Sequence, residues 1–300
     1  MAAVTTASIA TATAMPKRAN PAWAFIRSQP LGFAGFLIII VYVVAALGAS
    51  WIAPFDPEAV DFVAMLAKPD SEHWFGTDQY GRDVFSRLVF GARTALAVGI
   101  LSAVFGCSVG ALIGAASGYF GGRIDTAIQR VVDIMLSFPI IVLAMVVVAV
   151  LGKRMLFGVD FNLIAAIALP FIPKMARIAR SSTLSIVAMP FIDAARAAGF
   201  SHKRIVLRHI LPNIIAPYLI MTTAFIAQAI LLEASLSFLG LGVTEPTPAW
   251  GLMLSGSSAD FYKSAPWMIM FPGLAITLAV FAFNMFGDSL RDWLDPKMKG

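Results

Sequence analysis

The chain offers few side chains for acid–base or nucleophilic chemistry. Its three histidines, His73, His202 and His209, lie in polar segments or at the ends of apolar ones, so none can act as the base for a serine nucleophile at membrane depth. The sequence contains neither a His-Glu-x-x-His zinc pattern nor the Gly-x-x-x-x-Gly-Lys-Ser/Thr loop that binds nucleotide phosphates. We therefore expect no catalytic residue, no metal or cofactor bound by this chain, and no hydrolysis of ATP.

Three polar residues of a later apolar segment are candidates for lining a transport pathway: Thr222, Gln228 and Glu233. Carboxylates inside membrane segments can mark such pathways, but we favour a capping or packing role at the outer interface for Glu233. Thr222 and Gln228 could equally form hydrogen bonds between helices. The other carboxylates, Asp133 and Asp288, lie near segment ends. This placement disfavours an ion-coupled secondary transporter, which stays the alternative function class.

Composition places the chain in a lipid membrane. Of its 300 residues, 59% are hydrophobic and only 13% are charged, whereas soluble domains average about 25% charged residues. The net charge of +5 does not indicate a nucleic-acid partner, because the basic residues gather at the ends of apolar runs. The single Cys107 cannot form an intrachain disulfide. We expect one all-α domain that crosses the membrane several times.

Six apolar segments are candidates for crossing about 30 Å of hydrocarbon. The fourth is uncharged only over 161–173, so we extend it to residue 180 and let Lys174 and Arg177 reach the interface. Pro139 is expected to kink the third. The six predicted transmembrane helices are 31–54, 94–118, 124–151, 161–180, 213–232 and 267–287.

The polar segments fall into two groups by charge. Six spans place both termini on one side, which carries 15 of the 22 Lys and Arg residues, whereas the other side carries seven. By the positive-inside rule, both termini and segment 181–212 are cytoplasmic, and segments 54–93 and 240–266 face outside. Residues 1–28 are predicted to form a flexible cytoplasmic tail, ahead of a membrane domain at 29–300.

The second predicted span carries a glycine at every fourth position. Gly106, Gly110, Gly114 and Gly118 therefore lie along one face of the helix. A face without side chains allows the backbone of a neighbouring helix to come very close. We predict that this glycine stripe packs against another helix.

The polar stretch 189–213 predicts two short helices around a glycine. The first is rich in alanine, the best helix former, and has Asp193 near its positive end. Gly199 can adopt the left-handed conformation that closes a helix, and Ser201 can cap the next one. Close approach by another protein is favoured by a face nearly without side chains, formed by Ala194, Ala195 and Ala198.

This stretch resembles the cytoplasmic coupling loop of ABC-importer permease subunits. The family pattern is Glu-Ala-Ala, three residues, Gly, nine residues, Ile, one residue, Leu-Pro. The matching positions here are Asp193, Ala194, Ala195, Gly199, Leu211 and Pro212. Asp193 replaces the family's Glu with a shorter side chain, and His209 occupies the Ile position. An ordinary amphipathic surface helix–turn–helix is the alternative interpretation.

Further segments are similar to the dipeptide/oligopeptide/nickel branch of that family. They are FGTDQYGRD and SRLVFGAR before the second span, GYFGGRIDT and VDIMLSFP around the start of the third, RHILPN at the end of the polar stretch, and EASLSFLGLGVTEPTPAWGLML after the fifth. Together they cover most of residues 30–295.

The resemblance implies the C-type permease subunit of a binding-protein-dependent importer, with the type I fold, in a bacterial inner membrane. It also implies three kinds of partner: a second homologous permease, two ATPase subunits that bind ATP and Mg²⁺, and an external substrate-binding protein. Dipeptides or oligopeptides are the expected substrates, with nickel, glutathione or opine-like solutes as alternatives. The ATPase-coupling residues would be Asp193, Ala194, Ala195, Ala198, Gly199, Leu211 and Pro212.

Overall fold

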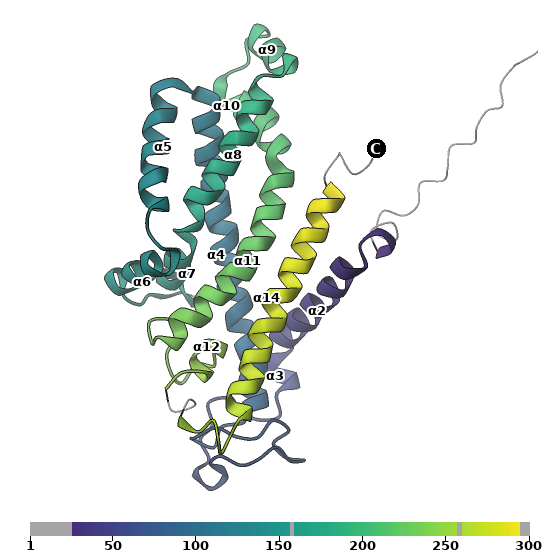
Figure 1. Ribbon diagram of the computed structural model, residues 1–300, viewed down its shortest axis with the longest axis vertical. Coiled ribbons are helices and arrows are strands. Elements are labelled where there is room, and N and C mark those ends of the chain that lie inside the picture. Colours follow the sequence, from purple (N-terminus) through teal and green to yellow (C-terminus); the bar gives the residue numbers. More distant parts are fainter. Residues whose placement is uncertain (1–25, 157–158, 257–259, 295–300) are drawn as a thin grey trace, which may run out of the picture.

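The computed structural model describes residues 26–156, 159–256 and 260–294, and the regular structure within them is helical apart from one short hairpin. The all-α prediction is confirmed. In Figure 1 the long helices run along the longest axis, with α9 and α10 projecting at one end and extended loop segments at the other. Most of the predicted tail at 1–28, and the C-terminal Lys297 and Lys299, lie outside the described residues.

The elements follow one another with short connections. In chain order the helices are α2 (Pro30–Leu47), α3 (Ala49–Ile52), α4 (Val84–Phe120), α5 (Gly122–Leu136), α6 (Ile140–Leu151), α7 (Phe161–Ala168), α8 (Phe171–Val187), α9 (Pro190–Ala197), α10 (His202–Ile205), α11 (Ile215–Phe238), α12 (Trp250–Met253) and α14 (Trp267–Leu294). The hairpin pairs β1 (Met155–Leu156) with β2 (Val159–Asp160) in antiparallel register.

Among the described residues, four helices are long and apolar enough to cross a membrane, or up to six if each of two bent pairs forms one span. The four are α2, α4, the run His202–Phe238 and α14. The bent pairs are α5 with α6, at 92°, and α7 with α8, at 45°. Each of the six predicted spans overlaps one of these helices or pairs.

The long helix α4 organises the bundle. Its 37 residues extend about 55 Å at 1.5 Å per residue, well beyond the roughly 30 Å of hydrocarbon in a bilayer. It begins where the Asp83 carboxylate accepts a hydrogen bond from the Ser86 amide at 2.7 Å, so residues 84–93, which the sequence placed in an external loop, are helical. Helices α2, α8 and α11 pack along it.

The glycine stripe of α4 lies against the α7–α8 pair. A Cβ added at Gly114 would lie 2.2 Å from the carbonyl oxygen of Ala176, and one added at Gly118 would lie 2.9 Å from the Thr183 Cβ. Real Cβ atoms essentially never approach closer than 3.0 Å. The two helices are therefore in backbone contact through the four positions Gly106, Gly110, Gly114 and Gly118.

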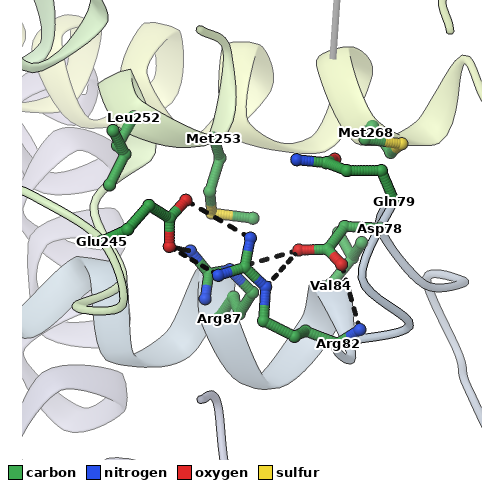
Figure 2. A pocket seen from close by; sticks show the side chains of 9 residues that line it. All are labelled: Asp78, Gln79, Arg82, Val84, Arg87, Glu245, Leu252, Met253 and Met268. Atoms are coloured by element: carbon green, nitrogen blue, oxygen red, sulfur yellow. Dashed lines mark hydrogen bonds and ion pairs between the residues drawn. The ribbon is translucent and has the colours of Figure 1, made fainter. Parts of the chain in front are cut away.

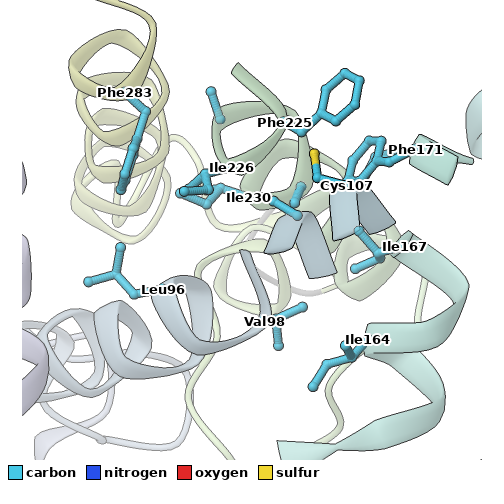
Figure 3. Close-up of a cluster of buried hydrophobic side chains, with 14 of the residues drawn as sticks. Leu96, Val98, Cys107, Ile164, Ile167, Phe171, Phe225, Ile226, Ile230 and Phe283 are labelled. Atoms are coloured by element: carbon cyan, nitrogen blue, oxygen red, sulfur yellow. The ribbon is translucent and has the colours of Figure 1, made fainter. Parts of the chain in front are cut away.

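Apolar side chains from α4, α7, α8, α11 and α14 meet in one core, part of which Figure 3 shows. The rings of Phe171 and Phe225 stack with centroids 4.7 Å apart. Cys107 is fully buried beside them. It packs there as a small apolar side chain.

The third predicted span is broken rather than kinked. Pro139 has no N–H to continue the helix and disfavours helical geometry at the residue before it; α5 ends at Leu136 and α6 starts at Ile140 in a direction 92° away. Ion pairs then hold α5 to α8. Arg180 donates to both oxygens of Asp125 at 2.6 and 2.5 Å, and Arg177 pairs with Asp133.

Candidate functional site

The polar stretch between α8 and α11 forms a projection at one end of the bundle (Figure 1). The start of α2 and the end of α14 lie toward the same end. The opposite end carries the loop segments before α4 and after α11. Segments that connect the long helices therefore lie at both ends of the bundle.

Helix α9 is closed by a glycine motif, as the sequence predicts. Gly199 has φ 75°, in the left-handed region. Its amide donates to the Arg196 carbonyl at 3.0 Å, and the Phe200 amide donates to the Ala195 carbonyl at 3.1 Å. These two bonds form a Schellman motif, which satisfies the last carbonyls of α9 and reverses the chain.

The second half of the projection runs directly into the membrane helix. Ser201 caps α10 by accepting a hydrogen bond from the Arg204 amide at 3.3 Å, as predicted. A π-helical turn (Val206–Ile210) and a 3₁₀ turn (Leu211–Ile214) follow, and the 3₁₀ turn takes in Pro212 at its start. Since these turns accommodate the missing N–H of Pro212, the helix continues to Phe238 without a break. Leu211 is half-buried there, and Pro212 is exposed.

The predicted coupling residues divide between surface and core. Asp193, Ala194 and Ala198 are exposed, and Gly199 is exposed beside them. Ala195 instead is buried against this chain's own residues, with Ile192 one turn earlier. The prediction that Ala195 contributes to a face open to another protein is wrong, because the inward side of α9 is the one that carries both residues.

Contacts to the end of α4 fix the projection in place. The hydroxyl of Tyr119 lies 2.7 Å from Nδ1 of His202, and the Arg196 guanidinium lies 5.6 Å from the Tyr119 ring centroid. Arg204 lies over the Phe200 ring at 3.9 Å. The sequence reasoning missed the pairing of Tyr119 with His202, since nothing local links positions 83 residues apart.

The three pathway candidates do not share one open surface. Thr222 is buried and donates to the Tyr218 carbonyl at 2.7 Å, as a helix-packing residue does. Gln228 is half-buried. Glu233 is fully buried; one carboxyl oxygen accepts a hydrogen bond from Ser237 at 2.7 Å, and the other has no partner among the described residues. The packing role favoured for Glu233 fits this position.

A cluster of two arginines and two carboxylates lies at the opposite end of the bundle (Figure 2). Arg82 donates to Asp78 at 2.6 Å and to the two oxygens of Glu245 at 2.5 and 3.3 Å. Arg87 reaches Glu245 at 3.4 Å and donates to the carbonyl of Pro57 at 2.9 Å. We call these four residues, Asp78, Arg82, Arg87 and Glu245, the outer ion cluster, after the side on which the sequence predicts segments 54–93 and 240–266 to lie. It joins the segment before α4 to the segment after α11.

Both arginines of the outer ion cluster are buried, at 5% and 1% exposure. Burial opposes the charge of Arg82, but its hydrogen bond to Glu245 and the field of Asp78 leave its pKa raised above the usual value. A two-pronged guanidinium–carboxylate pair is among the strongest polar contacts in proteins. The sequence reasoning treated both segments as family signatures and did not anticipate that their charges meet.

The chain is similar in sequence to known transport proteins. Residues 110–300 match the family model of the binding-protein-dependent transport system inner membrane component, and residues 20–69 match that of the N-terminal TM domain of oligopeptide transport permease C. The chain is 43% identical over 274 residues to the dipeptide transport system permease protein DppC of Alkalihalophilus pseudofirmus, covering 91% of this chain and 88% of that protein. It is 44% identical over 279 residues to the glutathione transport system permease protein GsiD of Escherichia coli, covering 93% and 90%.

The fold also has a solved counterpart. A chain of the inward-facing MetNI methionine ABC transporter aligns with a TM-score of 0.54 at 20% sequence identity, covering 70% of this chain and 98% of that one. This likeness supports the type I importer permease fold. Taken with the matched family models and the extent of the relatives, it shows that the chain is a multi-pass membrane protein of the ABC importers and belongs to the family of binding-protein-dependent transport system inner membrane components.

Proposed function

We propose that this chain forms half of the translocation pathway of an ATP-driven importer for short peptides. The substrate class is supported by the names of its relatives, a dipeptide permease and a permease for the tripeptide-like glutathione. It is also supported by the match of residues 20–69 to a segment of oligopeptide permeases. Nickel or opine-like solutes are not favoured by any of these relatives.

The importer contains, in this proposal, a second homologous permease, two ATPase subunits and an external substrate-binding protein. ATP and Mg²⁺ bind to the ATPases, and this chain binds no cofactor. The observation that carries the proposal is the α9–α10 projection, a rigidly closed helix pair that continues into a membrane helix. Exposed Asp193, Ala194 and Ala198 at its tip would meet the ATPase.

The projection can act as a lever. When two ATPases close around ATP, a docked α9 moves with them, and the unbroken run His202–Phe238 carries that motion into the bundle. Tyr119 transmits it to α4 as well, through its contact with His202. ATP binding thereby changes the relative stability of the inward-open and outward-open states, because a ligand shifts such an equilibrium by its different affinity for the two states.

The orientation follows from charge and from the shared end of the bundle. We propose that the α9–α10 projection and both termini are cytoplasmic, since Arg196, Lys203 and Arg204 on the projection are exposed and basic. Reporter fusions after Lys299 and within 56–72 should then report opposite compartments. The same compartment for both would overturn this topology.

Reconstitution tests the function as a whole. The chain, its second permease and the ATPases in proteoliposomes should take up a dipeptide only when ATP and the external binding protein are both supplied, and the binding protein should stimulate hydrolysis. This chain alone should give no uptake. Uptake by the lone chain, driven by an ion gradient, would instead establish a secondary transporter.

A further inference from the structure

A cleft of about 780 Å³ opens at the outer end of α4, beside the outer ion cluster. Its walls are the segment after α3, the second to fourth turns of α4, residues beside and within β1 and β2, the first turn of α7 and the segment after α11. This volume lies within the roughly 300–1,000 Å³ of small-ligand pockets in proteins. The charged residues that line the cleft, among them Glu58, Arg93 and Lys153, take no part in the ion cluster.

Two cations that line this cleft form no ion pair with the described residues. Arg93 is held by its Nε, which donates to the Ala46 carbonyl at 3.0 Å, and by the Phe90 ring, 5.3 Å from the guanidinium carbon. These contacts leave the two terminal nitrogens of Arg93 without an acceptor among the described residues. Lys153, which also lines the cleft, is exposed and forms no ion pair within the described part of the chain.

The carboxylates of the cleft differ in how far they are engaged. Asp160 caps α7 by accepting from the amides of Asn162 and Leu163 at 3.0 and 3.4 Å. Asp56 accepts from the Glu58 amide at 2.9 Å. The carboxylate of Glu58 itself has no hydrogen-bond or ion-pair partner among the described residues. Among the described residues, the cleft therefore offers two cations that form no ion pair and one carboxylate that has no partner.

The level of the cleft along α4 suits a point of entry. Arg93 is the last charged residue before the apolar part of α4, and the next charged residue along the chain is Arg123. A solute arriving from outside thus meets these charges just before the part of the helix that lies within hydrocarbon. A planar guanidinium with two free donors is matched in shape to a carboxylate, which it binds through two parallel hydrogen bonds.

We propose that this cleft is a low-affinity docking site for short peptides, with the terminal carboxylate bound by Arg93 and Lys153 and the terminal ammonium facing Glu58. The proposal rests on the proposed function and adds a subsite to it. The ligand is recognised by its two opposite terminal charges. Side chains of many kinds fit, since the rest of the lining is open and mixed.

The test uses the complete transporter in phosphatidylcholine nanodiscs without the external binding protein, so that this protein's own specificity does not enter. Saturation-transfer NMR compares the binding of Ala-Ala with that of its C-terminal amide, which lacks the carboxylate. We expect the free acid to bind about tenfold more tightly, the value of one charge-assisted contact at a partly exposed site. In Arg93→Gln the difference should fall below about twofold, and Arg93→Lys should retain part of it.

Control variants separate this site from general effects. Lys68→Gln removes the same charge from an exposed outer position away from the cleft and should leave the tenfold difference intact. Arg93→Gln also loses the bond to Ala46, so Lys153→Gln, which loses no protein contact, is the second variant and should reduce the difference on its own. Equal binding of acid and amide to the native transporter, or full discrimination in both variants, would overturn the proposal.

Two further outcomes are informative. Loss of peptide binding when phosphatidylglycerol replaces phosphatidylcholine would assign the cleft to an anionic lipid headgroup and overturn the peptide site. If the native transporter takes up dipeptide with ATP and binding protein but does not distinguish acid from amide, the docking site is refuted and the proposed function stands. Absence of that uptake refutes the proposed function instead.

Discussion

Replacing Gly114 by alanine tests the backbone contact between α4 and α8. The new Cβ would lie 2.2 Å from the Ala176 carbonyl oxygen and 2.8 Å from the Ala179 Cβ. Since real Cβ atoms stay beyond 3.0 Å, the two helices must separate locally by about 0.8 Å. Both Ala176 and Ala179 are fully buried, so no flexible side chain can move away to make room.

The expected cost follows from that separation. Overpacking a well-packed contact destabilises by about 1–3 kcal/mol, and a gap of this size forfeits roughly a quarter to a half of each neighbouring dispersion contact. Alanine returns about 1 kcal/mol through its better helix propensity. The balance for Gly114→Ala is a net loss of up to about 2 kcal/mol. Gly114→Leu adds three more carbons at the same place and should prevent α4 and α8 from packing.

Gly273 in α14 provides the matched control, because a Cβ there would meet nothing within 4 Å. Gly273→Ala should be neutral or slightly stabilising. Thermal unfolding of the purified chain in detergent measures both variants, with about 2–4 °C expected for each kcal/mol. If Gly114→Ala unfolds at the same temperature as Gly273→Ala, the close approach of the two helices is not what stabilises this bundle.

Three further changes probe the ends of the bundle. In Gly199→Val the new side chain meets no neighbour, but a β-branched residue is forced to φ 75°, which costs about 1–2 kcal/mol. The variant should insert normally and lose ATPase binding in a pull-down. Normal binding would show that α9 is not part of the coupling surface. Tyr119→Phe removes the hydrogen bond to His202 and should lower the number of peptides taken up per ATP hydrolysed, without reducing membrane insertion. An unchanged number of peptides per ATP would show that the Tyr119–His202 contact transmits no motion to α4. Glu245→Gln weakens the ion pair with Arg82, in which the Glu245 side chain is half exposed, and should cost about 1 kcal/mol of stability. Thermal unfolding measures this cost, with Glu72→Gln as the control. An equal melting temperature for the two variants would contradict the prediction.

Local sequence patterns predicted what depends on local geometry. The spacing of the α4 glycines was enough to place them on one face, because residues four apart are neighbours on any helix. The left-handed conformation of Gly199 was predictable from its position after an alanine-rich helix. The apolar runs indicated where the chain crosses the membrane, since span length is set by the bilayer.

Features that depend on packing were not predictable in the same way. Pro139 signals an interruption, but neither the 92° angle between α5 and α6 nor the ion pairs of Asp125 and Asp133 with α8 can be inferred from neighbouring residues in the sequence. Ala195 faces inward because it lies on the same face of α9 as Ile192, and the bundle covers that face. Composition alone cannot say which face of a short helix is covered.

The outer ion cluster has a consequence for how the chain is made. Arg82 precedes Glu245 by 163 residues, and chains are synthesised from the N-terminus at about 5–20 residues per second. Both arginines therefore emerge roughly 8–30 s before their shared carboxylate, with Asp78 as the one cluster carboxylate already present. The cluster can form only after α11 has been translated. A nascent chain that already has α4 across the membrane therefore still lacks the contacts of Arg82 and Arg87 with Glu245. Closure of this cluster thus follows the synthesis of Glu245, and a chain terminated before that residue leaves both arginines without their shared carboxylate.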